Sequence, residues 1–139
     1  MADYIPDIAD LLPQKAPFIM VGELLYADDT TTRTRFLIRS GNPLVDDGRF
    51  TEGGLLENIA QTVAAGTGYM ALREGRTVGP GHIVSVSRFN VVSLPLVGDE
   101  LLTETVIRTR IPDIIVISGR VTCNTVEIAT CEMKILTSV

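Results

Sequence analysis

The stretch from Phe50 to Glu74 constrains the fold of this chain more than any other part of the sequence. Between Leu55 and Leu72 the only charged residue is Glu57, no proline interrupts, and helix-forming and small residues dominate. A helix that is apolar on nearly every face has to be buried on nearly every face. A bare carboxylate is costly to bury, so the position of Glu57 calls for a structural or chemical reason.

A membrane span is the first alternative for this stretch, because a span takes roughly 20 apolar residues. Polar groups inside a lone span are expensive, and five polar residues lie within the stretch: Glu57, Asn58, Gln61, Thr62 and Thr67. We therefore predict a helix that is wrapped by a sheet and no interaction with a membrane.

Length and composition set the broad class. The 139 residues suit one domain, over 1–139, with one sizeable core. Hydrophobic residues make up 45% of the chain, which argues against disorder. Twelve basic and seventeen acidic residues give a net charge of -5, which argues against a nucleic-acid partner. The first four residues have neither the basic run nor the apolar core of a secretion signal, so we expect a cytoplasmic protein.

The two cysteines and the single histidine, His82, fit no metal site. Cys123 and Cys131 are out of register if their segments form a hairpin that turns near Asn124 and Thr125, and then they cannot easily form a disulfide. Their spacing with one histidine matches no zinc pattern. We predict two reduced thiols used as small core residues, no metal and no cofactor.

The segments around the long helix read as strands. An apolar helical spacing covers Ile5–Leu12, and a short apolar strand is expected at 18–21, leading on to 23–26. Threonines and arginines alternate over Thr30–Ile38, which is typical of a strand with one wet face. The sequence from Ser40 to Gly48 is a loop that leads into the helix, and Gly75 ends the helix.

The C-terminal half is predicted to consist of strands near His82–Val92, Glu100–Arg110, Ile114–Cys123 and Val126–Leu136. Two strands, one long helix and then four antiparallel strands make an α+β arrangement. A curved antiparallel sheet wrapped around one central helix explains why that helix has so few polar positions.

The order of these elements resembles that of the hotdog fold. Three sequence segments resemble, within that fold, the 3-hydroxyacyl-ACP dehydratases of the FabZ type. Residues 11–21 (LLPQKAPFIMV) resemble the family segment LLPHRYPFLLVD. Residues 56–61 (LENIAQ) resemble its helix start LEAMAQ. Residues 83–101, ending in LPLVGDEL, resemble its strand and turn FRRPVVPGDQL. The loop at 42–50 (NPLVDDGRF) is more similar to a divergent branch, the dehydratase-like proteins of aryl-polyene gene clusters.

The loop before the helix departs from the family. The catalytic histidine of the family falls on Pro43 and its second histidine on Asp47, while Gln14 replaces the histidine of the N-terminal segment. Thr51 and Glu52 stand where the family has proline and glycine. The resemblance therefore carries over the carboxylate and the amide of the helix, but not the base.

Dehydration of a 3-hydroxyacyl thioester needs a base for the C2 proton, an acid for the departing hydroxyl and donors for the enolate oxygen. By the resemblance, Glu57 is the acid or a carboxylate that positions the substrate; the alternative is a structural acid bonded to a neighbouring loop or subunit. Gln61 lies one turn further along the same face, where it orients Glu57 or a substrate, or is a buried amide whose hydrogen bonds are satisfied. Gly53 and Gly54 open the helix, where free N–H groups can hold a thioester oxygen; the alternative for both is close backbone packing.

The candidates for a substitute base are Asp46, Asp47 and His82. Asp46 and Asp47 lie where the family's histidines cluster, but Asp-Asp-Gly is also ordinary turn chemistry. His82 begins a strand far in sequence from that loop, and the alternative to a catalytic role is a structural or surface histidine. The sequence leaves open whether catalysis survives.

Three functions fit these residues. The first is an acyl-thioester-binding protein of the dehydratase line, acting on acyl-ACP or acyl-CoA in fatty-acid or polyene-type synthesis. The second is an acyl-CoA or acyl-ACP thioesterase in which Glu57 activates water or attacks the thioester. The third is a non-catalytic subunit that pairs with an active, histidine-bearing dehydratase.

The resemblance also implies an obligate dimer or an oligomer of dimers, either of one chain or with a histidine-bearing homologue, because hotdog protomers pair edge to edge. An unpaired β edge is an aggregation risk. We expect the apolar residues of that edge to be Phe89, Val91, Val92 and Leu94.

Overall fold

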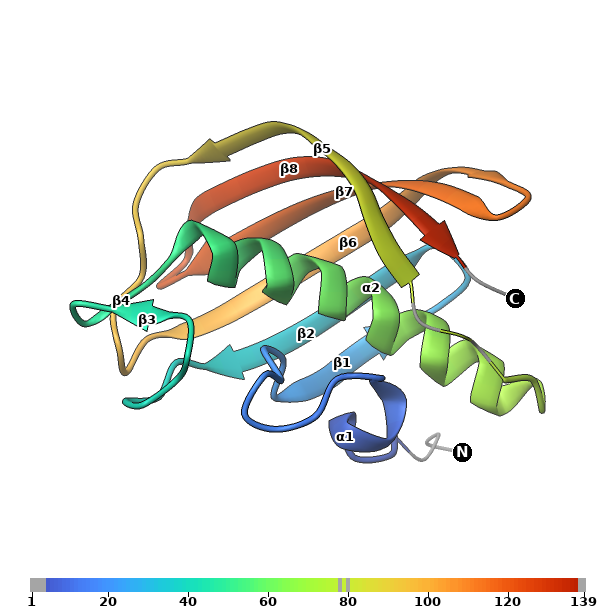
Figure 1. Cartoon of the computed structure of the whole chain (residues 1–139), viewed down its shortest axis with the longest axis horizontal. Coiled ribbons are helices and arrows are strands. Elements are labelled where there is room, and N and C mark those ends of the chain that lie inside the picture. The colour runs from blue at the N-terminus through green and yellow to red at the C-terminus, as the bar shows by residue number, and fades with distance from the viewer. Residues whose placement is uncertain (1–4, 78, 80, 138–139) are drawn as a thin grey trace.

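A curved antiparallel sheet holds one long helix on its inner face (Figure 1). The computed structural model describes residues 5–77, 79 and 81–137. The helix, α2 (Glu52–Arg73), packs along the inner face of this sheet. The strand order is β1-β2-β6-β7-β8-β5, and the strands are β1 (Glu23–Ala27), β2 (Thr31–Leu37), β5 (Gly81–Val91), β6 (Glu100–Ile111), β7 (Ile114–Cys123) and β8 (Val126–Thr137). This is the predicted α+β arrangement.

The smaller elements lie at the two ends of α2. The short helix α1 (Ile8–Leu11) packs against α2, and a two-stranded hairpin of β3 (Val45–Asp46) and β4 (Arg49–Phe50) leads into its N-terminus. None of the helices within the described residues combines the length and apolar character of a membrane span.

The main core lies between α2 and the sheet. Leu55 and Ile59 of the helix are fully buried against residues such as Leu101, Ile117 and Val121 of the strands. The sequence pattern predicted this burial, since a helix with so few charged residues has no solvent-facing side of its own.

The ends of α2 are defined by capping groups. Thr51 Oγ1 accepts a hydrogen bond from the Gly54 N–H at 3.2 Å, which is an N-cap. At the other end Gly75 has a φ of +69°, the left-handed conformation that favours glycine after a helix. Gly75 therefore ends the helix, as the sequence predicted.

The predicted strand at 18–21 was wrong. This segment is irregular and lies outside the sheet, and its backbone groups pair with side chains of α2. The Met20 N–H donates to Gln61 Oε1 at 2.7 Å, and Asn58 Nδ2 donates to the Met20 carbonyl at 2.7 Å. An apolar run can be buried without sheet partners when side-chain amides satisfy its backbone.

The two cysteines are free and buried, and they are out of register as predicted. Cys131 lies opposite Gly119, and Cys123 lies opposite Val126 next to the β7–β8 turn.

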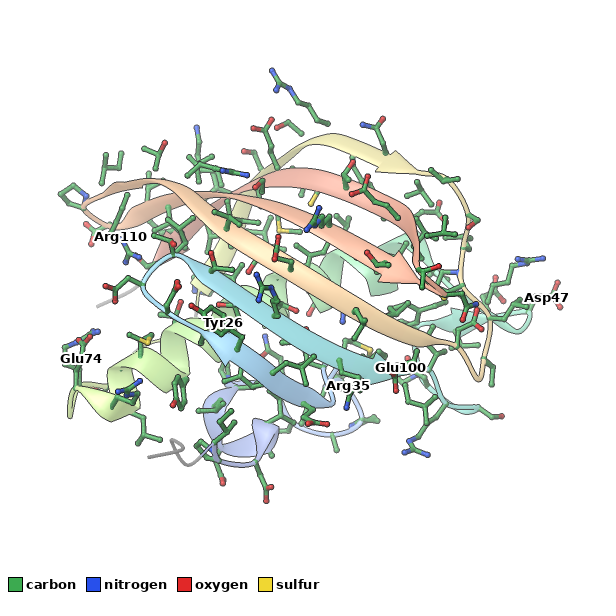
Figure 2. The ribbon with its side chains drawn as sticks, turned by 180° about the vertical axis from the view of Figure 1, so that it is seen from behind. Tyr26, Arg35, Asp47, Glu74, Glu100 and Arg110 are labelled. Carbon is green, nitrogen blue, oxygen red and sulfur yellow. The ribbon has the colours of Figure 1, made fainter. Side chains whose placement is uncertain are left out.

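The outer face of the sheet is polar. Figure 2 shows this face from behind, with Arg35 of β2 and Glu100 of β6 among its side chains. Arg33 pairs with Glu104 at 2.7 Å, while the threonines that alternate with these arginines, Thr32 and Thr34, are buried under the sheet. The alternation in β2 therefore separates a solvent-exposed face from a buried one, as predicted.

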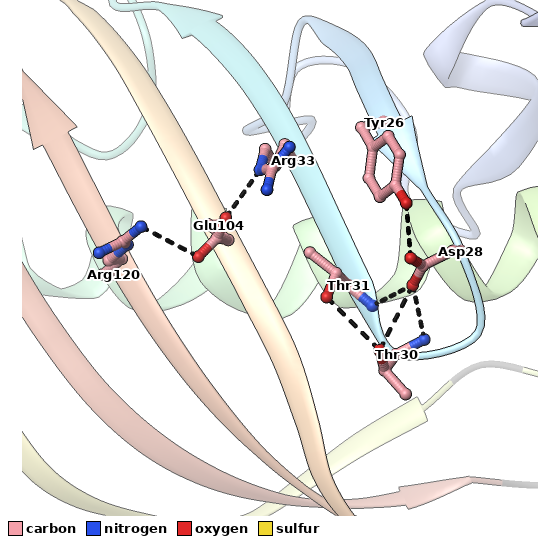
Figure 3. Close-up of polar contacts among 7 residues, drawn as sticks. All are labelled: Tyr26, Asp28, Thr30, Thr31, Arg33, Glu104 and Arg120. Atoms are coloured by element: carbon pink, nitrogen blue, oxygen red, sulfur yellow. Dashed lines mark hydrogen bonds and ion pairs between the residues drawn. The ribbon is translucent and has the colours of Figure 1, made fainter.

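Asp28 organises the turn between β1 and β2 (Figure 3). Its carboxylate accepts hydrogen bonds from the Tyr26 hydroxyl at 2.6 Å and from the N–H groups of Thr30 at 2.9 Å and Thr31 at 2.7 Å. The bond from Tyr26, followed by those from the two backbone groups, lowers the pKa of Asp28 to about 2. Hydrogen bonds to a carboxylate favour its charged form.

The lowered pKa of Asp28 gives a pH-dependent contribution to stability. A carboxylate whose pKa is lower in the folded state stabilises the protein above its ordinary pKa of about 4, and this stabilisation is lost as the pH falls towards about 2. The stability difference between the native protein and Asp28→Asn should therefore be constant at neutral pH and shrink over this window. Urea unfolding at several pH values measures it; a difference that does not change with pH would contradict the assignment.

Candidate functional site

A cavity of about 600 Å³ runs along one face of α2. Its wall is formed by the helix from Glu57 to Leu72, by the N-terminal segment around Gln14 and by the first residues of β5. Glu57 and Leu72 are fifteen residues apart, which corresponds to about 22 Å along the helix axis. The lining therefore extends along the helix, which suits a chain-like ligand.

The carboxylate of Glu57 is at one end of the helical wall of this cavity and is held by Gln61. Glu57 is half-buried, and its Oε1 accepts a hydrogen bond from Gln61 Nε2 at 3.1 Å. The same Nε2 donates to the Phe18 carbonyl at 3.0 Å, while Gln61 Oε1 accepts from the Met20 N–H. Gln61 is fully buried. It therefore fixes the carboxylate and the N-terminal segment at the same time.

A second buried amide, that of Asn58, links the N-terminal segment to strand β6. Its Oδ1 accepts from Thr103 Oγ1 at 2.6 Å and its Nδ2 donates to the Met20 carbonyl. Thr62 Oγ1 bonds to the Asn58 carbonyl at 2.8 Å and to Thr34 Oγ1 at 2.7 Å. These bonds join the first turns of α2 to β2 and β6, so the position of Glu57 is set by the sheet.

Gly53 and Gly54 lie in the first turn of α2, and neither is among the described residues that line the cavity. The Gly54 N–H is donated to Thr51 Oγ1, and a Cβ at Gly54 would lie 2.7 Å from the Phe50 ring. Gly54 thus allows close packing. The predicted contact of these two glycines with a thioester oxygen stays a prediction.

Asp46 and Asp47 lie on the β3–β4 hairpin, with Asp47 at its exposed tip (Figure 2). Asp47 and Gly48 have φ values of +51° and +75°, which form the turn. Pro43, where the family has its histidine, is exposed on the preceding loop. Among the described residues that line the cavity, none of these three side chains is found.

A family model described as ApeP-like, ApeP dehydratase, matches residues 6–138. The chain belongs to the ApeP-like family. This confirms the resemblance to the aryl-polyene branch of the dehydratases. A search of curated protein sequences finds no match.

Solved structures confirm the hotdog fold of this ApeP-like chain. The dehydratase heterocomplex ApeI:P from Xenorhabdus doucetiae aligns with a TM-score of 0.90 and 13% identity, over 96% of this chain and 92% of that one. The PaaI protein of the phenylacetic acid degradation operon of E. coli aligns with a TM-score of 0.66 and 10% identity, over 82% of this chain and 81% of that one. The smu.793 protein of Streptococcus mutans, solved with acetyl CoA, aligns with a TM-score of 0.62 and 14% identity, over 84% of this chain and 87% of that one.

His82 lines the same cavity as Glu57 in this ApeP-like chain. It is exposed and is the second residue of β5. The sequence singled out His82 but gave no reason to place it beside the helix, because that placement depends on how β5 pairs with β8 at the edge of the sheet. The role of His82 as a substitute base stays a prediction.

Small residues on α2 make room for the cavity and its N-terminal wall. Ala60, Ala64 and Gly68 recur at a spacing of four residues and all line the cavity. A Cβ at Gly68 would lie 2.6 Å from the carbonyl oxygen of Leu11. The sequence contained this signal, a stripe of small residues on the face that carries Glu57, but it was not assigned to a cavity.

Gly68→Ala is expected to destabilise the protein by about 1–3 kcal/mol, because a backbone oxygen must move to make room for the methyl group. The displaced segment belongs to the cavity wall, so ligand binding should weaken as well. Gly53→Ala is the matched control on the same helix, since the nearest atom to its Cβ is 3.8 Å away. Chemical unfolding compares the two; equal stabilities would contradict the close approach.

Proposed function

We propose that this chain is one subunit of a heteromeric dehydratase that acts on 3-hydroxyacyl thioesters of ACP or CoA. In this proposal it supplies Glu57 and the acyl-binding cavity, and the partner subunit supplies the base. The observation that carries the proposal is the position of Glu57, a half-buried carboxylate held by Gln61 on the wall of an elongated cavity. The heterocomplex formed by the similar ApeI:P dehydratase supports a partner of a different kind.

The proposed reaction divides its two proton transfers between the subunits. A histidine of the partner removes the C2 proton of the acyl chain, and the electron pair left on C2 forms the C2–C3 double bond. The C3–O bond breaks, and Glu57 gives a proton to the departing hydroxyl, which leaves as water. The products are a 2-enoyl thioester and water, so no oxidant, reductant or cofactor is needed.

Strand β5 is the proposed contact with the partner. It is an edge strand, with β8 as its neighbour in the sheet formed by the described residues. Its apolar residues Ile83, Val84 and Val86 are 40%, 56% and 36% exposed. An edge with free backbone groups and exposed apolar side chains favours pairing with another strand. Ile83 also lines the cavity, so a partner on β5 would border the site.

Of the four apolar residues predicted for the edge strand, Phe89 and Val91 lie on β5, whereas Val92 and Leu94 follow its end at Val91. Phe89, Val91 and Leu94 are partly buried and pack against the core of their own protomer. Val92 is exposed but follows the end of β5.

Co-expression with the histidine-bearing homologue from the same organism tests the proposal. The mass of a 3-hydroxyacyl-ACP is followed after incubation with each protein alone and with the complex. We expect this chain alone to leave the carrier unchanged and the complex to remove one water. Loss of water with this chain alone would refute the shared site and point to Asp46, Asp47 or His82 as base. Loss of the whole acyl group would indicate a thioesterase.

A charge in the middle of the edge strand tests the interface. Val84→Lys places an ammonium group where strand pairing would bury it, so the complex should dissociate, which light scattering at micromolar concentration detects. Lys134→Arg on β8, which keeps an exposed charge, serves as control. A stable complex with Val84→Lys would place the interface elsewhere.

A further inference from the structure

Gln14 carries an unpaired acceptor on the wall of the cavity. Its side chain lines the same cavity as Glu57, and its Oε1 is buried without a hydrogen-bond partner among the described residues. Most buried side-chain oxygens in proteins have a partner, and one that lacks it calls for an explanation such as a functional role or a bound molecule. No other side-chain oxygen in the described part of the chain is in this state.

A short run of backbone and one shared side chain link Gln14 to Glu57, and both residues line the same cavity. A turn directly after Gln14 is closed by the Phe18 N–H, which donates to the Lys15 carbonyl at 2.8 Å. The Phe18 carbonyl accepts from Gln61 Nε2, and the same nitrogen donates to Glu57 Oε1. One chain turn and one shared amide group therefore connect Gln14 to Glu57.

We propose that Gln14 is a positioning residue whose Oε1 accepts a hydrogen bond from the 3-hydroxyl of the acyl chain; this rests on the proposed dehydratase function. In that reaction the hydroxyl oxygen receives a proton from Glu57, so its own hydrogen is free to be donated to another acceptor. Rotation about the terminal torsion of the side chain, which is broad for an amide, turns the buried oxygen towards the cavity.

The bond to Gln14 strengthens as the reaction proceeds. As Glu57 transfers its proton to the hydroxyl, the oxygen becomes more positive until the C3–O bond has broken, so its own hydrogen is a better donor during this step. An interaction that is stronger in the transition state than in the bound substrate raises kcat. Gln14 therefore affects both the affinity for the hydroxylated substrate and the rate of its dehydration.

Two ligands that differ only in the 3-hydroxyl test this inference. Calorimetry measures the Kd of 3-hydroxyoctanoyl pantetheine and of octanoyl pantetheine for the full-length chain in complex with its histidine-bearing partner. Gln14→Met keeps the length of the side chain and removes the acceptor, so it should weaken binding of the hydroxylated ligand about fivefold. Binding of the saturated ligand should not change. Gln14→Glu, which keeps an acceptor, should keep the discrimination.

The ratio of the two Kd values separates positioning from a structural role. A loss of affinity that is equal for both ligands, or no loss for either, would overturn the assignment of Gln14 and leave the proposed function intact. If the native complex bound neither ligand, the proposed function would fail, and the role of Gln14 with it. Thermal unfolding of each variant confirms that the fold is retained.

Discussion

Replacing Glu57 by glutamine is expected to slow dehydration by the proposed heteromeric complex about 100- to 10,000-fold, the usual contribution of a positioned acid. Glutamine has nearly the same shape and can still accept a hydrogen bond from Gln61, so the cavity and the fold should be retained. It has no proton to give to the departing hydroxyl. The rate of appearance of the 2-enoyl thioester measures the effect, and the thermal midpoint checks the fold.

The matched control is Glu52→Gln. Glu52 is an exposed acid in the first turn of the same helix and lies outside the cavity lining among the described residues. Its variant should retain nearly full activity. If Glu57→Gln retained native activity as well, the acid would have to come from the partner subunit, and the division of the reaction proposed above would be wrong.

Replacing Asn58 by leucine is expected to lower the free energy of unfolding by about 3–5 kcal/mol. Asn58 is fully buried, and its amide pairs with the Met20 carbonyl and with Thr103 Oγ1. A leucine of similar size leaves both groups buried without a partner, and each such group costs about 1–3 kcal/mol. Because Met20 belongs to the segment that Gln61 also holds, the cavity wall should loosen together with the fold.

Denaturant titration compares this variant with Asn90→Ala. Asn90 is an exposed amide on β5 with one hydrogen bond to the carbonyl of Arg88. Its removal should change stability by less than about 1 kcal/mol. A loss for Asn58→Leu as small as that for Asn90→Ala would mean that the buried network contributes little to holding α2 on the sheet.

The parts of the fold that sequence reasoning found are those with a local signal. The helix predicted between Phe50 and Glu74 lies at Glu52–Arg73, because its uncharged run, its N-cap threonine and Gly75 all act within a few residues. The strand at Ile114–Cys123 was predicted to the residue. The segment at 18–21 was misassigned, because its partners are side chains about 40 residues away in the sequence.

The candidate site divides in the same way. Glu57 and Gln61 could be found from the family motif and from a spacing of one helical turn, and the structure joins them by a hydrogen bond. The place of His82 on the cavity wall could not be found, since it follows from long-range strand pairing. Gln14 attracted attention as a missing histidine, whereas its unpaired oxygen becomes visible once the cavity is formed.

The exposed edge of β5 has a consequence for how this subunit is made. Apolar residues such as Val84 are exposed on it, and among the described residues no further strand pairs with its outer edge. A chain synthesised in excess of its partner would present a strand that can pair with any other free edge, including that of another copy. For the heteromeric complex proposed above, we therefore expect the two subunits to be produced in matched amounts, because an excess of this chain would aggregate through the free edge.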